Sequence, residues 1–127
     1  MPNFKVGFYE KDNGTFPAEA FILEQSPKMR ARIYQYIRLL EIKGNELREP
    51  YSKFLRDGIF ELRIQQGSDI ARVLYFFVVG RNVILTNGFI KKSQKTPDEQ
   101  IELAKKYKAD YESRIGVIQW PKILENL

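Results

Sequence analysis

Two arginines have a spacing in this sequence that suggests chemistry. The dipeptide Gly67-Ser68 separates two apolar runs, and a glycine in the first central position suits a type II′ hairpin turn. As a two-residue loop, this dipeptide places Arg63 directly opposite Arg72 on the paired strands. Like charges that face each other across a strand pair destabilise it. The pair therefore suggests an anion-binding site. The alternative is that both arginines are solvated at the sheet margin or paired with Glu61.

A lysine from the following strand is expected to join the two arginines. The register of that strand depends on the length of the loop after residue 79. If the loop consists of residues 81–82, and not of the three residues 80–82, Lys91 lies opposite Arg72. If it holds three, Lys92 shares the face of Arg72, one step further along the strand. Either register brings one lysine to the arginine pair.

The net positive charge of the chain is concentrated in the same segment. Residues 53 to 95 contain eight basic and three acidic residues, which accounts for the net charge of +5 of the whole chain. The other residues contain equal numbers of basic and acidic side chains. A basic excess confined to one segment is typical of a phosphate-binding surface, although a solvated basic face would have the same composition.

A central strand is needed to hold these side chains in place. The run from Val73 to Val79 contains seven consecutive apolar residues, which predicts a strand buried on both faces in the middle of a sheet. Residues 59–65 and 83–90 flank it across short turns, so the three form an antiparallel meander. Alternation in the first of these strands puts Glu61 and Arg63 on the face opposite the core.

The remaining elements are predicted from local signals. We expect a strand near residues 4–9, a short helix from Pro17, and a second helix that begins after Ser26 and ends at Gly44. Residues 45–58 are expected to form a loop. The segment 96–99, Thr-Pro-Asp-Glu, predicts a capping box for a helix that runs to about residue 114 and stops at Gly116. We therefore predict one domain over residues 1–127, with residues 116–127 as a C-terminal extension.

Composition excludes several classes of chemistry. The chain contains neither cysteine nor histidine, so disulfides, thiol chemistry and a zinc site built from these residues are excluded. The absence of histidine also removes the usual general base, and no other cofactor is expected. We find no signal sequence and no segment long enough to span a membrane, which favours a soluble cytoplasmic protein without a membrane partner.

Three segments resemble the motifs of a known family. Residues 55–63, LRDGIFELR, are similar to the D-G-hydrophobic-aromatic-E-L-R signature of HigB-like toxins in the RelE/ParE superfamily. Residues 72–76, RVLYF, resemble the R-V-L-Y strand of that family, and residues 88–97, GFIKKSQKTP, resemble its G-F-x-K-K-T-x-K-T-P segment. With weaker matches up to residue 111, the resemblance covers residues 50 to 113.

The resemblance implies a small RelE-like α+β fold, with N-terminal helices packed on one face of an antiparallel sheet and a C-terminal helix. It also implies a toxin of a type II toxin–antitoxin system that cleaves mRNA on the ribosome. Such a toxin would be a metal-independent endoribonuclease, or mRNA interferase, neutralised by a helix-turn-helix antitoxin of the HigA-like type. Two alternatives are a ParE-like toxin that acts on a protein such as gyrase, and a catalytically degenerate protein that only binds RNA or antitoxin.

The resemblance assigns roles to several residues. The basic positions of the family fall on Arg63, Arg72 and Lys91 or Lys92, and additional RNA contacts are expected from Lys53, Arg56 and Lys95. RNA cleavage through the neighbouring 2′-hydroxyl needs a base, cations for the phosphorane, and an acid for the leaving oxygen. The arginines suit the phosphorane, and a lysine beside them should have a lowered pKa and could donate a proton.

Two positions leave the identity of the base open. Glu61 could serve as the base, although a structural salt bridge is the preferred interpretation. Asn87 stands where family members commonly have histidine, so a catalytic histidine is not carried over. The ribosome and the positioning of the strand could supply much of the rate.

Overall fold

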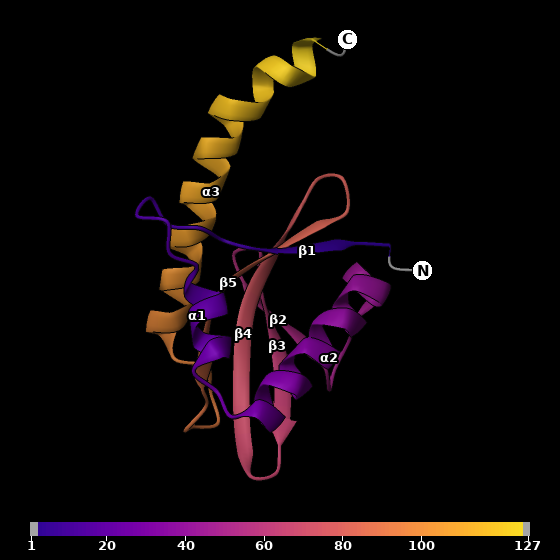
Figure 1. Ribbon diagram of the computed structural model, residues 1–127, viewed down its shortest axis with the longest axis vertical. Helices are drawn as coiled ribbons and strands as arrows, with labels where there is room; N and C mark the ends of the chain where they lie inside the picture. Colours follow the sequence, from indigo (N-terminus) through magenta and orange to yellow (C-terminus); the bar gives the residue numbers. More distant parts are fainter. Residues whose placement is uncertain (1–2, 126–127) are drawn as a thin grey trace.

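The protein is an α+β fold built on one five-stranded sheet, seen in a computed structural model that describes residues 3–125, with side chains described up to Arg114 (Figure 1). The α+β class predicted from the sequence is confirmed. In chain order the elements are β1 (Lys5–Phe8), α1 (Pro17–Leu23), α2 (Pro27–Lys43), the 3-10 helix η1 (Gly44–Glu46), β2 (Ser52–Arg56), β3 (Ile59–Gln66), β4 (Asp69–Val78), β5 (Asn82–Ile90) and α3 (Asp98–Glu125).

Strand β4 lies in the middle of the sheet, as the apolar run predicted. The strand order is β1-β5-β4-β3-β2, and β3, β4 and β5 form the expected antiparallel meander. Strand β1 pairs with β5 in parallel orientation and forms one edge of the sheet.

The β3–β4 hairpin has the predicted register. Gly67 and Ser68 form the two-residue loop, and Gly67 has a φ of 63°, in the left-handed region that glycine tolerates at no steric cost. Arg63 is consequently the direct partner of Arg72.

Both predicted registers for β4 and β5 are wrong. The turn consists of residues 79–81, because Val78 pairs with Asn82. A bulge then shifts the register by one residue between Leu74 and Tyr75. As a result, Arg72 pairs with Phe89, and neither Lys91 nor Lys92 lies at the predicted position. Lys91 continues the line of β5 beyond its last residue, where its backbone N–H donates to the carbonyl of Ile70 at 2.8 Å.

Helices cover the sheet on both faces, which explains why the apolar run of β4 is continuous. Val73 and Tyr75 belong to the core shared with α1 and α2, whereas Leu74 and Phe76 pack with Ala104 of α3. Helices α1 and α2 lie on one face in Figure 1, and α3 runs along the other side of the strands. Strand residues that lie on the same face as Leu74 and Phe76 are therefore the ones that can approach the start of α3.

The local helix signals were partly correct. Ser26 caps α2 by accepting a hydrogen bond from the backbone N–H of Met29, and the helix ends at Gly44, as predicted. Helix α3 begins at Asp98 and continues to Glu125, so the prediction that Gly116 stops it is wrong. The C-terminal extension predicted from residue 116 is therefore a continuation of α3 up to Glu125.

The prediction of a loop over residues 45–58 is also wrong in part. Its second half forms β2, an edge strand in which Lys53 pairs with Glu61 of β3. Proline and several charged residues mask the strand pattern in this segment of the sequence. Within the part of the chain that the structure describes, no helix is long and apolar enough to span a membrane.

Candidate functional site

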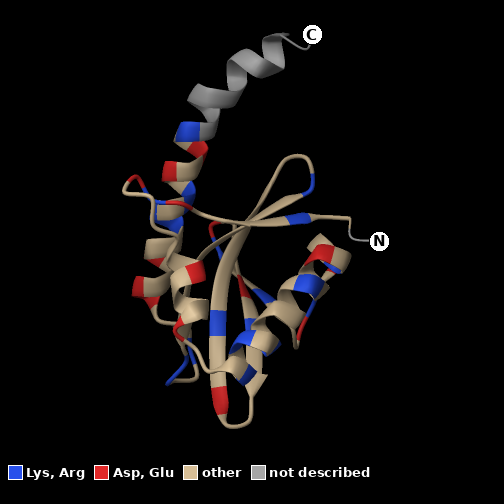
Figure 2. Ribbon diagram, viewed as in Figure 1, with Lys and Arg blue, Asp and Glu red and all other residues tan. Residues whose placement is uncertain are grey.

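Four cations surround one buried carboxylate on the sheet face that carries α3. This basic cluster consists of Lys53, Arg63, Arg72 and Lys91 around Glu61. The register puts Lys53 beside Glu61 and Arg63 beside Arg72, and all of them lie on the same face as the residues that pack against α3. The cluster occupies the part of this face nearest to the β3–β4 hairpin, before α3 begins, and Figure 2 shows basic positions on β4 and on the segment that follows β5.

The carboxylate of Glu61 lies between the two arginines. Its Oε1 is 3.6 Å from Nε of Arg72, and its Oε2 is 3.7 Å from Nε of Arg63. The side chains of Glu61 and Arg72 are 3 % and 5 % exposed, so both charges of this pair are buried. A buried charge persists only when it is paired and hydrogen-bonded. Glu61 is therefore the salt-bridge partner of both arginines, which relieves the repulsion between them.

Thr96 provides the other partner of this carboxylate. Its hydroxyl donates to Oε1 of Glu61 at 2.5 Å, and both residues are buried. The sequence suggested that Thr96 would cap α3, but the helix begins two residues later and the hydroxyl is directed to the sheet. No local pattern could reveal a bond between residues 35 positions apart.

Arg72 has hydrogen-bonding capacity that its protein partners do not use. Its Nη1 donates to the carbonyl of Ala71 at 3.1 Å, whereas its Nε is buried without a hydrogen-bond partner among the described residues. Burial lowers the pKa of the Arg72 guanidinium, Glu61 opposes this shift, and the charge of Arg63 adds to it. A second anion beside Arg72 would therefore be bound favourably.

The pKa of Lys91 is lowered from its ordinary value, as predicted for a lysine beside two arginines. Partial burial contributes most, followed by the charges of Arg72 and Arg63, while Glu61 acts in the opposite direction. Lys91 is thus the lysine that joins the cluster. It does so diagonally, because Phe89 occupies the position opposite Arg72. Lys92 is exposed in the segment between β5 and α3.

The three residues expected to make further RNA contacts differ in their surroundings. Lys53 is exposed at the edge of the cluster, and Lys95 is exposed in the segment before α3. Arg56 lies away from the cluster and is paired with acidic side chains, at 3.1 Å from Asp98 and 2.9 Å from Glu102. Its guanidinium would have to leave these carboxylates to contact RNA.

Asn87 is buried on the same face as the cluster. Its side-chain amide donates to the backbone oxygen and to Oε1 of Gln100 in α3, at 3.3 and 3.0 Å. Its own Oδ1 has no hydrogen-bond partner among the described residues. The contacts of Asn87 therefore attach α3 to β5, next to the cluster.

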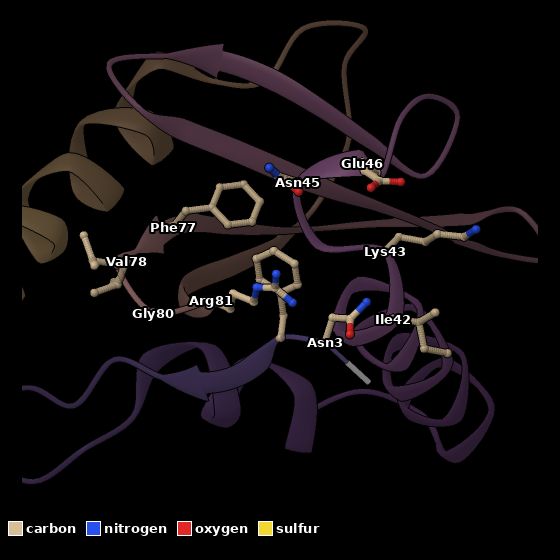
Figure 3. A pocket seen from close by; sticks show the side chains of 11 residues that line it. Asn3, Ile42, Lys43, Asn45, Glu46, Phe77, Val78, Gly80 and Arg81 are labelled. Atoms are coloured by element: carbon tan, nitrogen blue, oxygen red, sulfur yellow. The ribbon is translucent and has the colours of Figure 1, made fainter. Parts of the chain in front are cut away.

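Two hollows lie at opposite ends of β4. One, of about 300 Å³, adjoins the arginines and is lined by Tyr36, Pro50, Arg63, Ile64, Gln65, Ile70 and Arg72. The other, of about 720 Å³, lies between the turn after β4 and the end of α2, where Figure 3 shows Phe77, Lys43, Glu46 and Arg81 around it. None of the cluster residues lines the larger hollow. Of these two hollows, the smaller one adjoins the arginines of the cluster, while Lys53 lines a separate hollow of about 690 Å³.

This arrangement can hold an anion and donate a proton to it. Arg63 is 26 % exposed and its Nη1 is paired with the exposed Glu49 at 3.0 Å, so an anion would compete with this surface carboxylate for Arg63. Lys91 is half-buried and Arg72 is buried. Guanidinium groups bind phosphate oxygens in a bidentate manner, and an ammonium group with a lowered pKa is a better proton donor than an ordinary lysine. The carboxylate of Glu61 is already occupied by Thr96 and both arginines.

The comparison with protein families agrees with this architecture. Residues 20–109 match the family model described as phage-derived protein Gp49-like (DUF891), which covers most of the chain and all of the cluster. No curated protein matches the chain. The chain therefore belongs to the Gp49-like family of phage-derived proteins, which is part of the RelE/ParE-like toxin superfamily.

Proposed function

We propose that the protein is a HigB-like toxin of a type II toxin–antitoxin system and that it cleaves mRNA on the ribosome without a metal ion. A helix-turn-helix antitoxin of the HigA-like type neutralises it in the cytoplasm. The observation that carries this proposal is the pairing of Arg63 with Arg72 in register, with Lys91 beside them. Membership of the toxin superfamily supports it.

The arginines stabilise the charge that develops on the phosphate. When the 2′-hydroxyl attacks, the phosphorane gains negative charge on its non-bridging oxygens. Arg63 contacts these oxygens from the solvent side, while the buried Arg72 contributes a fixed positive charge beneath them. Glu61 and Thr96 hold Arg72 in place before the RNA arrives, so little reorganisation is needed during the reaction.

Lys91 is the proton donor for the leaving 5′-oxygen. Its lowered pKa brings it closer to the range in which proton transfer is efficient. Glu61 is not the base in this proposal, because its oxygens are engaged by Thr96 and the arginines. The ribosome positions the 2′-hydroxyl for attack, and a ribosomal RNA group or a water molecule accepts the proton of this hydroxyl as the oxygen–phosphorus bond forms. This dependence on the ribosome accounts for the proposed requirement for translation.

Induction of the protein alone, followed by mapping of mRNA 5′ ends, tests the proposal. We expect growth arrest and new mRNA ends within translated regions, and we expect these ends to disappear when translation initiation is blocked. New ends that persist without translation would exclude a ribosome-dependent enzyme. Growth arrest with broken DNA and intact mRNA would identify a ParE-like action on gyrase, and unimpaired growth would indicate a degenerate binder.

A further inference from the structure

We propose that the hollow beside the arginines is a nucleobase subsite and that Gln65 selects bases that carry an exocyclic amino group. This inference rests on the proposed nuclease function and specifies part of its substrate. The base concerned belongs to a nucleotide that flanks the cleaved phosphate. The proposal starts from the hollow of about 300 Å³, which has Arg63 and Arg72 on one side and Gln65 on another.

The lining of the hollow suits a flat ring better than a phosphate alone. Besides the two arginines, it is lined by Tyr36 and by the apolar side chains of Pro50 and Ile70, whereas Ile64 beside them is fully buried in the core. Single-stranded RNA is recognised by side chains that stack against the faces of unpaired bases and form hydrogen bonds with their edges. Apolar walls with a few polar groups are the usual composition of a pocket for an organic ligand.

The register places two residues of this lining, Gln65 and Ile70, directly beside the proposed phosphate position. Gln65 pairs with Ile70 in the row next to the pair of Arg63 and Arg72, and all four side chains lie on the same face. Residues two positions apart in a strand are separated by about 7 Å. One nucleotide can therefore put its phosphate against the arginines and its base against the neighbouring row.

Gln65 presents an acceptor to this space. Its side-chain Nε2 donates to the carbonyl of Gly67 at 3.2 Å, which fixes the orientation of the amide because a carbonyl can only accept. The side-chain oxygen of Gln65 is then available to accept a hydrogen bond. Adenine, cytosine and guanine carry an exocyclic amino group that can donate to it. Uracil carries none, and its one ring donor, N3–H, lies between two carbonyl oxygens that repel an acceptor.

The position of Gln65 is also fixed by the helix layer. Nε of Arg32 in α2 donates to the backbone carbonyl of Gln65 at 3.3 Å. The end of β3 is thus attached to α2, and Gln65 lines the hollow from a backbone whose carbonyl has a hydrogen-bond partner. A side chain whose backbone is fixed by hydrogen bonds discriminates between bases better than a side chain on a flexible loop.

The experiment compares cut-site preferences of the wild type and three variants after induction in cells, with mRNA ends mapped across all transcripts. We expect the mRNA ends produced by the wild-type protein to be depleted of uracil at one nucleotide position next to the cut. Gln65→Leu removes the acceptor and should reduce this bias by about fivefold to tenfold, the effect of one hydrogen bond. Gln65→Glu keeps an acceptor and should retain the bias.

Gln66→Leu is the matched control, because Gln66 lies on the same strand but on the opposite face. It should leave the bias unchanged. Circular dichroism of each purified variant checks that the fold is retained. Cutting by the wild type without any base bias, or a full bias in Gln65→Leu, would overturn the subsite while leaving the proposed nuclease intact. Absence of mRNA cutting by the wild type would overturn both.

Discussion

The hydroxyl of Thr96 donates a 2.5 Å hydrogen bond to the buried carboxylate of Glu61, which connects the start of α3 to the basic cluster. Glu61 in turn lies between Arg63 and Arg72. The geometry of the two arginines therefore depends on a residue that is outside the sheet and that carries no charge.

Replacing Thr96 by valine should destabilise the protein. Valine has nearly the same shape but cannot donate, so the buried carboxylate of Glu61 loses a partner. Loss of a hydrogen bond to a buried charged group costs roughly 1 to 3 kcal/mol. Urea denaturation measures this change, and Thr96→Ser, which keeps the hydroxyl, should restore most of the loss. Equal stability of Thr96→Val and the wild type would show that the bond contributes nothing.

The sequence predicted the parts of the site that depend on local geometry. The pairing of Arg63 with Arg72 follows from a two-residue turn with glycine at its first position, and a turn of this type sets the register of both strands. The continuous apolar run likewise predicted a strand covered on both faces, because no alternation is needed when both faces are buried.

The remaining parts depend on long-range contacts or on irregularities. The bulge between β4 and β5 leaves Thr86 without a pairing partner, and its hydroxyl donates to the carbonyl of Leu74 at 3.1 Å. Counting residues outward from the turn cannot detect such a bulge. Strand β2 forms because β3 offers it an edge, although its own sequence lacks clear alternation.

Replacing Arg72 by lysine should abolish most of the cleavage. Lysine retains a positive charge, but its ammonium group lies on a flexible stem and cannot reproduce the position at which Glu61 and the carbonyl of Ala71 hold the guanidinium. The fixed charge beneath the phosphate is therefore displaced. We expect the cleavage rate to fall by roughly 100-fold or more, which is comparable to the loss of one oxyanion donor. Arg81→Lys, in the turn at the other end of β4, is the matched control and should cleave normally. Normal cleavage by Arg72→Lys would remove Arg72 from the site.

Lys91 and Lys92 should differ sharply when each is replaced by glutamine. Lys91 belongs to the cluster and is proposed to donate the proton, a role that contributes about 100-fold to 10,000-fold. Lys92 is an exposed neighbour of the same type, so Lys92→Gln should cleave at nearly the wild-type rate. Single-turnover cleavage on programmed ribosomes measures both variants. Similar losses in the two variants would indicate a general effect of positive charge instead of proton donation by Lys91.

Binding of the free protein to single-stranded RNA should weaken as salt increases. The basic cluster has four cations, so only a few phosphates can be contacted. At about 0.7 per phosphate, contacts with three or four phosphates should give a slope of log affinity against log salt concentration of about −2 to −3. Fluorescence anisotropy at several salt concentrations gives this slope. An affinity that does not change with salt would argue against the basic cluster as the binding surface.

The titration of Lys91 tests the electrostatics of the cluster independently of cleavage. Burial and the charges of Arg72 and Arg63 lower the pKa of its amine below the ordinary value of 10.5. Since the folded-state pKa is lowered, the fold disfavours the protonated amine. This penalty is fully present below the lowered pKa and declines to zero as the pH rises from there to the ordinary value of 10.5 in the unfolded chain. NMR observation of the Lys91 side chain during a pH titration should give a midpoint below 10.5. In Arg72→Gln the midpoint should move upwards, because one of the neighbouring positive charges has been removed. A midpoint that is unchanged in this variant would mean that Arg72 and Lys91 do not interact, and the proposed proton donor would then lack its electrostatic basis.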